Sequence, residues 1–274
     1  MTKIKLALCQ MNVIDDKISN INKAKSMICE SANKSDFIIL PEMFNCPYSN
    51  DKFIEYGESE DDSYTLNEIS RLACEQEVYI LAGSIPEREN DKLYNTSYLF
   101  DNKGSIIAKH RKMHLFDIDV KGKITFKESD VLTPGNEFTV SDTEFGKIGI
   151  GICYDVRFVE LARIMTENGA LMLIYPGAFN QTTGPAHWEL LFRSRALDNQ
   201  VFCVGVAPAL NKEASYHSYG HSIVTNPWGD VIAQAGEKEE IIYCEIDFDE
   251  IKKVRDELPV LKNKREDLYE VIKK

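Results

Sequence analysis

Lys147-Ile148-Gly149-Ile150-Gly151-Ile152-Cys153-Tyr154-Asp155-Val156-Arg157-Phe158 carries the clearest structural signal in the chain. Isoleucine and glycine alternate, which is the period-two pattern of a strand, and the glycine face lets another element pack closely. We expect Asp155 to cap a following helix that ends at Asn168-Gly169. Cys153 therefore lies where a buried strand is predicted to turn into a helix.

Two interpretations of Cys153 follow from this position. Most free cysteines are small buried hydrophobic residues with no chemical role. A thiol beside the exposed N–H groups and positive end of a helix, in contrast, is favoured as thiolate and is therefore a better nucleophile. The choice between the two depends on which groups accompany Cys153.

Composition limits the classes of function. The 274 residues, 43% of them hydrophobic, predict one α/β domain over residues 1–274. A formal net charge of −12 disfavours nucleic acids and anionic membranes as partners. We expect no leader or membrane span, and seven scattered cysteines without a Cys-x-x-Cys pair suit a reducing compartment, so the expected location is cytoplasmic.

A second reactive group follows another strand. Asp36–Glu42 contains four consecutive apolar residues, which indicates a strand covered on both faces. Pro41 ends its ladder because proline has no N–H to donate. Glu42 is thereby placed at the rim of a buried strand, as Cys153 is.

A third group follows a predicted hairpin. Leu93–Phe100 and Ser105–Lys112 flank the turn signal Asp101-Asn102-Lys103-Gly104. The hairpin leads into Lys109–His114, a cationic run that is usually a solvated face. Because this run continues a strand, we expect at least one head group, that of Lys112, to point inward, with His110 and His114 in local hydrogen bonds. Residues 117–137, which include Glu128, are predicted to form a long surface excursion.

The remaining patterns alternate strands with helices and end in hairpins, which predicts a mixed pair of sheets covered by helices. The further expected strands are residues 3–13, 78–84, 170–175, 201–206, 220–225, 231–234 and 241–246, and the further expected helices are residues 20–33, 64–76, a segment after 184–188, and 249–258.

Glu42, Lys112 and Cys153 together suit acyl transfer. A thiol alone is a poor reagent at neutral pH. A carboxylate can take its proton, and a cation can hold the negative charge that develops on the substrate. This chemistry requires no metal or other cofactor.

The same residues, in this order and spacing, resemble the Glu-Lys-Cys triad of the nitrilase superfamily, the carbon-nitrogen hydrolases. Longer segments are similar to its ω-amidase branch, and the resemblance covers essentially the whole chain. These segments are Leu40–Tyr48, Leu93–Thr96, Arg111–Asp119, Gly122–Phe126, Tyr175–Asn180, Thr182–Leu191 and Asn226–Gly229.

The resemblance implies a four-layer αββα sandwich that pairs as an αββα-αββα homodimer, with a C-terminal helix and tail, residues 247–274, at the dimer interface. It implies hydrolysis of small anionic amides, 2-oxoglutaramate and 2-oxosuccinamate, through a thioester on Cys153. Glu42 would be the base, and Lys112 with the Tyr154 N–H would hold the oxyanion. Glu128 matches a second glutamate of the family, the alternative being a solvated loop carboxylate.

An ω-amide also carries a carboxylate, which a guanidinium binds best. Arg157 is expected to supply it, since it follows Cys153 by four residues, and the resemblance supports it with Tyr48, Ala178 and Phe179. The alternative for Arg157 is an ordinary helix-surface ion pair with Glu160.

Other functions remain open. Within the superfamily, an N-carbamoyl amidohydrolase or a nitrilase would use the same triad. Outside it, the chain could be a catalytically silent scaffold or a redox thiol protein, although no resolving cysteine lies near Cys153 in sequence. His217 and His221 have the spacing of a metal pair but no evident third ligand, so no metal site is expected.

Overall fold

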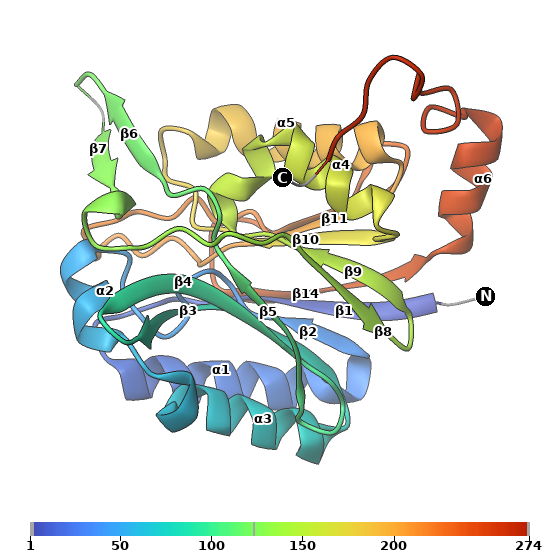
Figure 1. Cartoon of the computed structure of the whole chain (residues 1–274). Coiled ribbons are helices and arrows are strands. Elements are labelled where there is room, and N and C mark those ends of the chain that lie inside the picture. The colour runs from blue at the N-terminus through green and yellow to red at the C-terminus, as the bar shows by residue number, and fades with distance from the viewer. Residues whose placement is uncertain (1–2, 123, 273–274) are drawn as a thin grey trace.

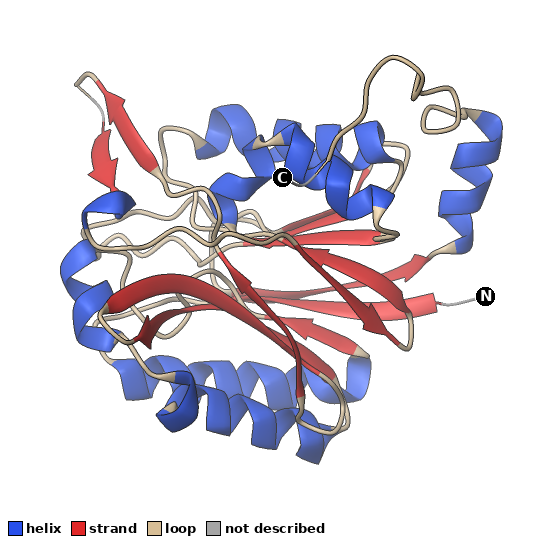
Figure 2. Cartoon of the chain, viewed as in Figure 1, coloured by secondary structure: helices blue, strands red, loops and turns tan. Residues whose placement is uncertain are grey.

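Two six-stranded sheets face each other in the computed structural model, which describes residues 3–122 and 124–272. Helices α1 and α3 cover the outer side of one sheet, and α4 and α5 cover the outer side of the other (Figure 1). The layers therefore run helix, sheet, sheet, helix (Figure 2), and the predicted αββα sandwich is confirmed. Lys123 and the last two residues of the tail lie outside the described residues.

The first sheet has the order β14-β1-β2-β3-β4-β5, with β1, β2 and β3 parallel and the others antiparallel. Its strands are β1 (Lys3–Gln10), β2 (Phe37–Ile39), β3 (Tyr79–Glu89), β4 (Lys92–Phe100), β5 (Ile106–Arg111) and β14 (Glu240–Asp247).

The second sheet repeats this plan in the order β13-β12-β11-β10-β9-β8, with β9, β10 and β11 parallel. Its strands are β8 (Thr139–Thr143), β9 (Gly146–Ile150), β10 (Met172–Pro176), β11 (Phe202–Val206), β12 (Ile223–Thr225) and β13 (Val231–Gln234).

The helices fill the outer layers and the connections. They are α1 (Lys17–Ser31), α2 (Asn50–Tyr56), α3 (Tyr64–Gln76), α4 (Val159–Glu167), α5 (Gly184–Asn199) and α6 (Asp249–Glu257), with 3₁₀ turns η1 (Ala32–Lys34), η2 (Glu60–Asp62), η3 (Glu128–Asp130) and η4 (Cys153–Arg157). No helix in the described ranges is long and apolar enough to span a membrane.

Alternation along the strands builds the core. In β1, Leu6 and Leu8 point into the layer between the sheets, whereas Ala7 and Cys9 face α1 and α3. Ile148 and Ile150 of β9 close the inner layer from the other side. The intervening Gly149 meets Leu173 and Met165 closely on the helix side, so the expected close packing against the glycine face is confirmed.

Most expected elements are present, and α3 and β13 have their predicted bounds. The surface excursion predicted over residues 117–137 is present, and it contains regular structure, because β6 (Asp117–Val120) and β7 (Ile124–Lys127) form a projecting hairpin (Figure 1). One expectation was wrong. No α-helix begins at Asp155, because η4 intervenes and α4 starts only at Val159.

Candidate functional site

The carboxyl ends of the central strands and the end of β5 bring three reactive groups together. Glu42 follows β2, Cys153 follows β9, and Lys112 follows β5. The Lys112 ammonium Nζ lies 2.9 Å from Glu42 Oε1, and both side chains are fully buried. Cys153 is also buried, with an exposed fraction of 4%. Ligands of open α/β sheets commonly bind at the carboxyl ends of parallel strands, so this placement favours a reaction site.

Glu42 is held on both oxygens. Oε1 accepts hydrogen bonds from Lys112 Nζ and, at 2.8 Å, from Asn95 Nδ2. Oε2 accepts from the Ala178 N–H at 2.6 Å. Burial raises the pKa of Glu42 above its ordinary value, although Lys112 opposes the shift. A carboxylate with a raised pKa accepts a proton more readily, which suits a general base.

Glu128 is a second buried carboxylate in the site. Its Oε1 lies 2.9 Å from Lys112 Nζ and accepts from the Tyr48 hydroxyl at 2.6 Å, while Oε2 accepts from the Phe116 N–H. The alternative of a solvated loop carboxylate therefore does not fit, since Glu128 is fully buried. Tyr48 also lies 3.4 Å from both Glu42 and Lys112, so its hydroxyl belongs to this cluster.

Lys112 is charged in spite of its burial. Burial disfavours an ammonium, but the negative charges of Glu128 and Glu42 outweigh it and hold the pKa of Lys112 well above its ordinary value. Lys112 can therefore serve as a fixed positive charge and hydrogen-bond donor, not as a base.

Cys153 differs electrostatically from the expectation. Burial first, and then the negative charge of Glu42, raise the pKa of the thiol well above its ordinary value. The thiolate expected from a helix N-terminus is therefore not its resting form, because burial and the charge of Glu42 both favour the protonated thiol. Cys153 at rest is a neutral thiol, and a base must remove its proton during attack.

The backbone is strained at Cys153 itself and at Met43, the residue that follows Glu42. Cys153 has φ +46°, and Met43, next to Glu42, has φ +52°. Non-glycine residues rarely adopt this left-handed conformation, and it is often found at functional sites. The Met43 N–H donates to Ser84 Oγ at 3.0 Å, which helps to hold this turn.

The turn that begins at Cys153 contains a candidate hydrogen-bond donor for an oxyanion. The first N–H groups of a 3₁₀ turn have no partner inside it, and the Tyr154 N–H is the next one after the nucleophile. Asp155 N–H, in contrast, already donates to Ile152 O at 3.0 Å.

Arg157 has no acidic partner among the described residues, so an ion pair with Glu160 is not formed. Nη1 and Nη2 each lie 3.3 Å from His187 Nδ1, and Nε is buried without a hydrogen-bond partner. The guanidinium lies 4.9 Å from the ring centre of Phe179. Burial lowers the pKa of Arg157. A half-buried guanidinium without an acidic partner is suited to bind an anion.

Ala178 has a different environment from the one expected. Its N–H donates to Glu42 and its carbonyl oxygen accepts from the Tyr216 hydroxyl, so both backbone groups bond within the protein. Direct substrate binding by Ala178 stays a prediction.

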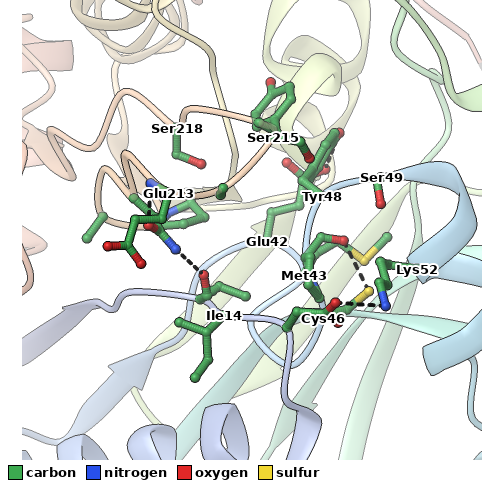
Figure 3. A pocket seen from close by; sticks show the side chains of 18 residues that line it. Ile14, Glu42, Met43, Cys46, Tyr48, Ser49, Lys52, Glu213, Ser215 and Ser218 are labelled. Atoms are coloured by element: carbon green, nitrogen blue, oxygen red, sulfur yellow. Dashed lines mark hydrogen bonds and ion pairs between the residues drawn. The ribbon is translucent and has the colours of Figure 1, made fainter.

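A pocket of about 380 Å³ opens beside the carboxylates, between the loops that follow β1, β2 and β11 (Figure 3). Glu42, Met43 and Tyr48 line one side of it, and Ser215, Tyr216 and Ser218 line another. Of the reactive cluster, Glu42 and Tyr48 line this pocket, whereas Lys112, Glu128 and Cys153 do not.

Sequence reasoning missed several residues around the site. Asn95 donates a hydrogen bond to Glu42, and Ser84 accepts one from the N–H of Met43, the residue after Glu42. His187 contacts Arg157. Asp155 contacts both His110 and His114. The local hydrogen bonds expected of the two flanking histidines are confirmed. Asn95 lies within Leu93–Thr96, one of the segments that resemble the ω-amidase branch, but the resemblance did not indicate that its side chain bonds Glu42. In the described ranges, no three His, Cys, Asp or Glu side chains are grouped to hold a metal ion.

Comparisons with known proteins agree with this geometry. The human protein named Omega-amidase NIT2 is 50% identical over 272 residues, which cover 99% of this chain and 98% of the human one. Yeast Nit3, described as a member of branch 10 of the nitrilase superfamily, superimposes with a TM-score of 0.89 at 44% identity, over 96% of this chain and 97% of Nit3. The NitFhit protein of C. elegans superimposes with a TM-score of 0.89 at 33% identity, over 99% of this chain and 67% of NitFhit.

The family model described as carbon-nitrogen hydrolase matches residues 5–256. This chain therefore belongs to the carbon-nitrogen hydrolase family.

Proposed function

We propose that the chain is an ω-amidase, which hydrolyses 2-oxoglutaramate to 2-oxoglutarate and ammonia and 2-oxosuccinamate to oxaloacetate and ammonia. The observation that carries this proposal is a buried Glu42–Lys112–Glu128 cluster next to the Cys153 thiol, with Arg157, which has no acidic partner among the described residues, four residues further on. The nearly full-length similarity to Omega-amidase NIT2 supports it.

The first half of the reaction forms a thioester. Glu42 takes the proton of Cys153 as Sγ attacks the amide carbon, and the carbonyl π electrons move to oxygen. Lys112 and the Tyr154 N–H stabilise that oxyanion. When the oxyanion collapses, the C–N bond breaks, and the proton on Glu42 passes to the departing nitrogen to give ammonia.

The second half releases the acid. Glu42 removes a proton from water, whose oxygen attacks the thioester carbon. The C–S bond then breaks, and the sulfur takes the proton back. Glu128 contacts no reacting atom in this scheme. It keeps Lys112 charged and oriented, because its carboxylate accepts a hydrogen bond from Nζ at 2.9 Å.

Substrate choice depends on the far carboxylate. Arg157 would bind it through its guanidinium, whose Nη atoms contact a ring nitrogen of His187 rather than a carboxylate, and the centre of the Phe179 ring lies 4.9 Å from that guanidinium. Tyr48, through its hydroxyl, would face the amide end with Glu42 and Lys112. This arrangement favours short acids with a terminal amide over neutral amides.

We also propose that the protein forms a homodimer in the cytoplasm and that residues 247–274 help to pair the subunits. Large apolar side chains exposed on α4 and α5 support a buried interface there. They are Val159, Leu190 and Leu197.

The test is ammonia release from 2-oxoglutaramate by the wild type and by Cys153→Ala, with a neutral amide, an N-carbamoyl amino acid and a nitrile as competing substrates. We expect the ω-amide to react fastest with the wild type and not at all with Cys153→Ala. Preference for a carbamoyl amino acid or a nitrile would overturn the substrate assignment. A thioester detected by mass spectrometry would separate a working enzyme from a silent scaffold.

A further inference from the structure

A single carboxylate, that of Asp155, contacts both segments that carry the reactive groups. Its Oδ2 accepts from the Ile152 N–H at 2.9 Å and lies 3.1 Å from His110 Nε2. Its Oδ1 accepts from the His114 N–H at 3.0 Å and lies 2.8 Å from His114 Nδ1. Asp155 is fully buried.

These four contacts bracket the reactive residues in sequence. Ile152 and Asp155 lie on either side of Cys153, and His110 and His114 lie two residues before and after Lys112. Side chains two residues apart on an extended chain point the same way. The Asp155 carboxylate therefore joins the nucleophile turn to the segment that presents the ammonium.

The network is anchored further at each end. His110 is fully buried, and its Nδ1 lies 3.0 Å from Thr139 Oγ1 on β8. The His114 ring stacks on Phe158, with 3.5 Å between ring centres. Both histidines are thus fixed by contacts that do not involve Lys112 itself.

We infer that Asp155 is a positioning residue that sets the distance and orientation between the Cys153 thiol and the Lys112 ammonium. This inference rests on the proposed function of that site. Cys153 has φ +46°, a conformation that persists only where the surroundings hold it. The hydrogen bond from the Ile152 N–H to Asp155 restrains the backbone on the N-terminal side of Cys153. The contacts of Asp155 with His110 and His114 fix the distance between this turn and the segment that carries Lys112.

His114 offers the cleanest test, because its side chain is partly exposed and its loss should leave the core intact. His114→Asn keeps an N–H donor near the position of Nδ1, and His114→Leu has nearly the same shape without a donor. Both variants lose the stacking on Phe158, so the comparison between them isolates the hydrogen bond to Asp155. His217→Leu, at an exposed loop position, is the control for replacing a histidine.

We expect His114→Leu to lower kcat for 2-oxoglutaramate about tenfold with KM unchanged, less than the roughly 10²-fold loss expected of a 1 Å misplacement. His114→Asn should recover most of that kcat. Equal kcat values for the two variants would overturn the inference, whether both match the wild type or both fall together.

A second readout does not depend on the substrate. The rate at which iodoacetamide alkylates Cys153, followed on its own peptide by mass spectrometry, should fall in His114→Leu and recover in His114→Asn. If the wild type releases no ammonia from any ω-amide but the alkylation rates follow this order, the proposed substrate is wrong and the positioning role stands. Identical alkylation rates in all variants would reject the positioning role even if the enzyme is active.

Discussion

Glu42 and Glu128 accept hydrogen bonds from the same ammonium, with Lys112 Nζ 2.9 Å from an oxygen of each. Two buried carboxylates this close repel each other and are stable as anions only with a cation between them. The pairing explains why the site combines a base, a charge stabiliser and a second carboxylate in one fully buried cluster.

Lys112→Met should therefore be both inactive and less stable. It removes the oxyanion charge and leaves the buried carboxylates without a cation, which costs roughly 3–5 kcal/mol when one member of a buried pair is lost. Ammonia release and chemical denaturation at neutral pH measure the two effects. Glu128→Gln is the matched variant, because it keeps the shape and removes one charge, and we expect slower turnover with a smaller loss of stability. Wild-type stability in Lys112→Met would contradict the charge argument.

Activity should fall on the acid side at a higher pH than an ordinary glutamate would give. Glu42 must be ionised to accept the Cys153 proton, and burial raises its pKa, so protonation as pH falls begins above the usual value of about 4.3. The pKa values of Cys153 and Lys112 both lie well above their ordinary values, so neither should limit activity at neutral pH. A kcat/KM profile from pH 4 to 9 checks this, and an acid limb centred below the usual glutamate value would disprove it.

Arg157→Leu should raise KM for 2-oxoglutaramate by roughly 10- to 100-fold, because a hydrogen bond to a charged group contributes about 1.5–3 kcal/mol. Turnover of a neutral amide of the same length should not change. Arg157→Lys keeps the charge without the fork and should give an intermediate KM. An equal loss of activity on 2-oxoglutaramate and on the neutral amide would indicate a structural role for Arg157 instead.

Gly83→Ala should disturb the site from a distance. A Cβ at Gly83 would lie 2.0 Å from the carbonyl oxygen of Pro41 and 2.3 Å from that of Leu40, so the segment carrying Glu42 must move. We expect a lower melting temperature and a large loss of kcat. Gly236→Ala, whose Cβ would meet only a Glu240 side-chain oxygen at 3.6 Å, is the control and should behave like the wild type. Unchanged activity in Gly83→Ala would show that the segment around Pro41 can shift without displacing Glu42 from its working position.

The sequence by itself determined most of the elements and the place of each reactive residue. Ile148 and Ile150 alternate with glycine, and the hairpin turn at residues 101–104 is local, so nearest-neighbour patterns were enough to predict β9 and the β4–β5 pair. The same patterns placed Glu42, Lys112 and Cys153 after strands, and the resemblance joined them into one site.

Only the tertiary structure decided how those residues are held. The hydrogen bond from Asn95 to Glu42 and the contacts of Asp155 with the two histidines join residues that are distant in sequence. The left-handed backbone at Met43 and Cys153 depends on such contacts. The neutral thiol of Cys153 likewise follows from burial among distant charges, not from its own turn. Periodicity reports which face of an element is buried, but burial and hydrogen bonds between loops arise only when the two sheets pack together.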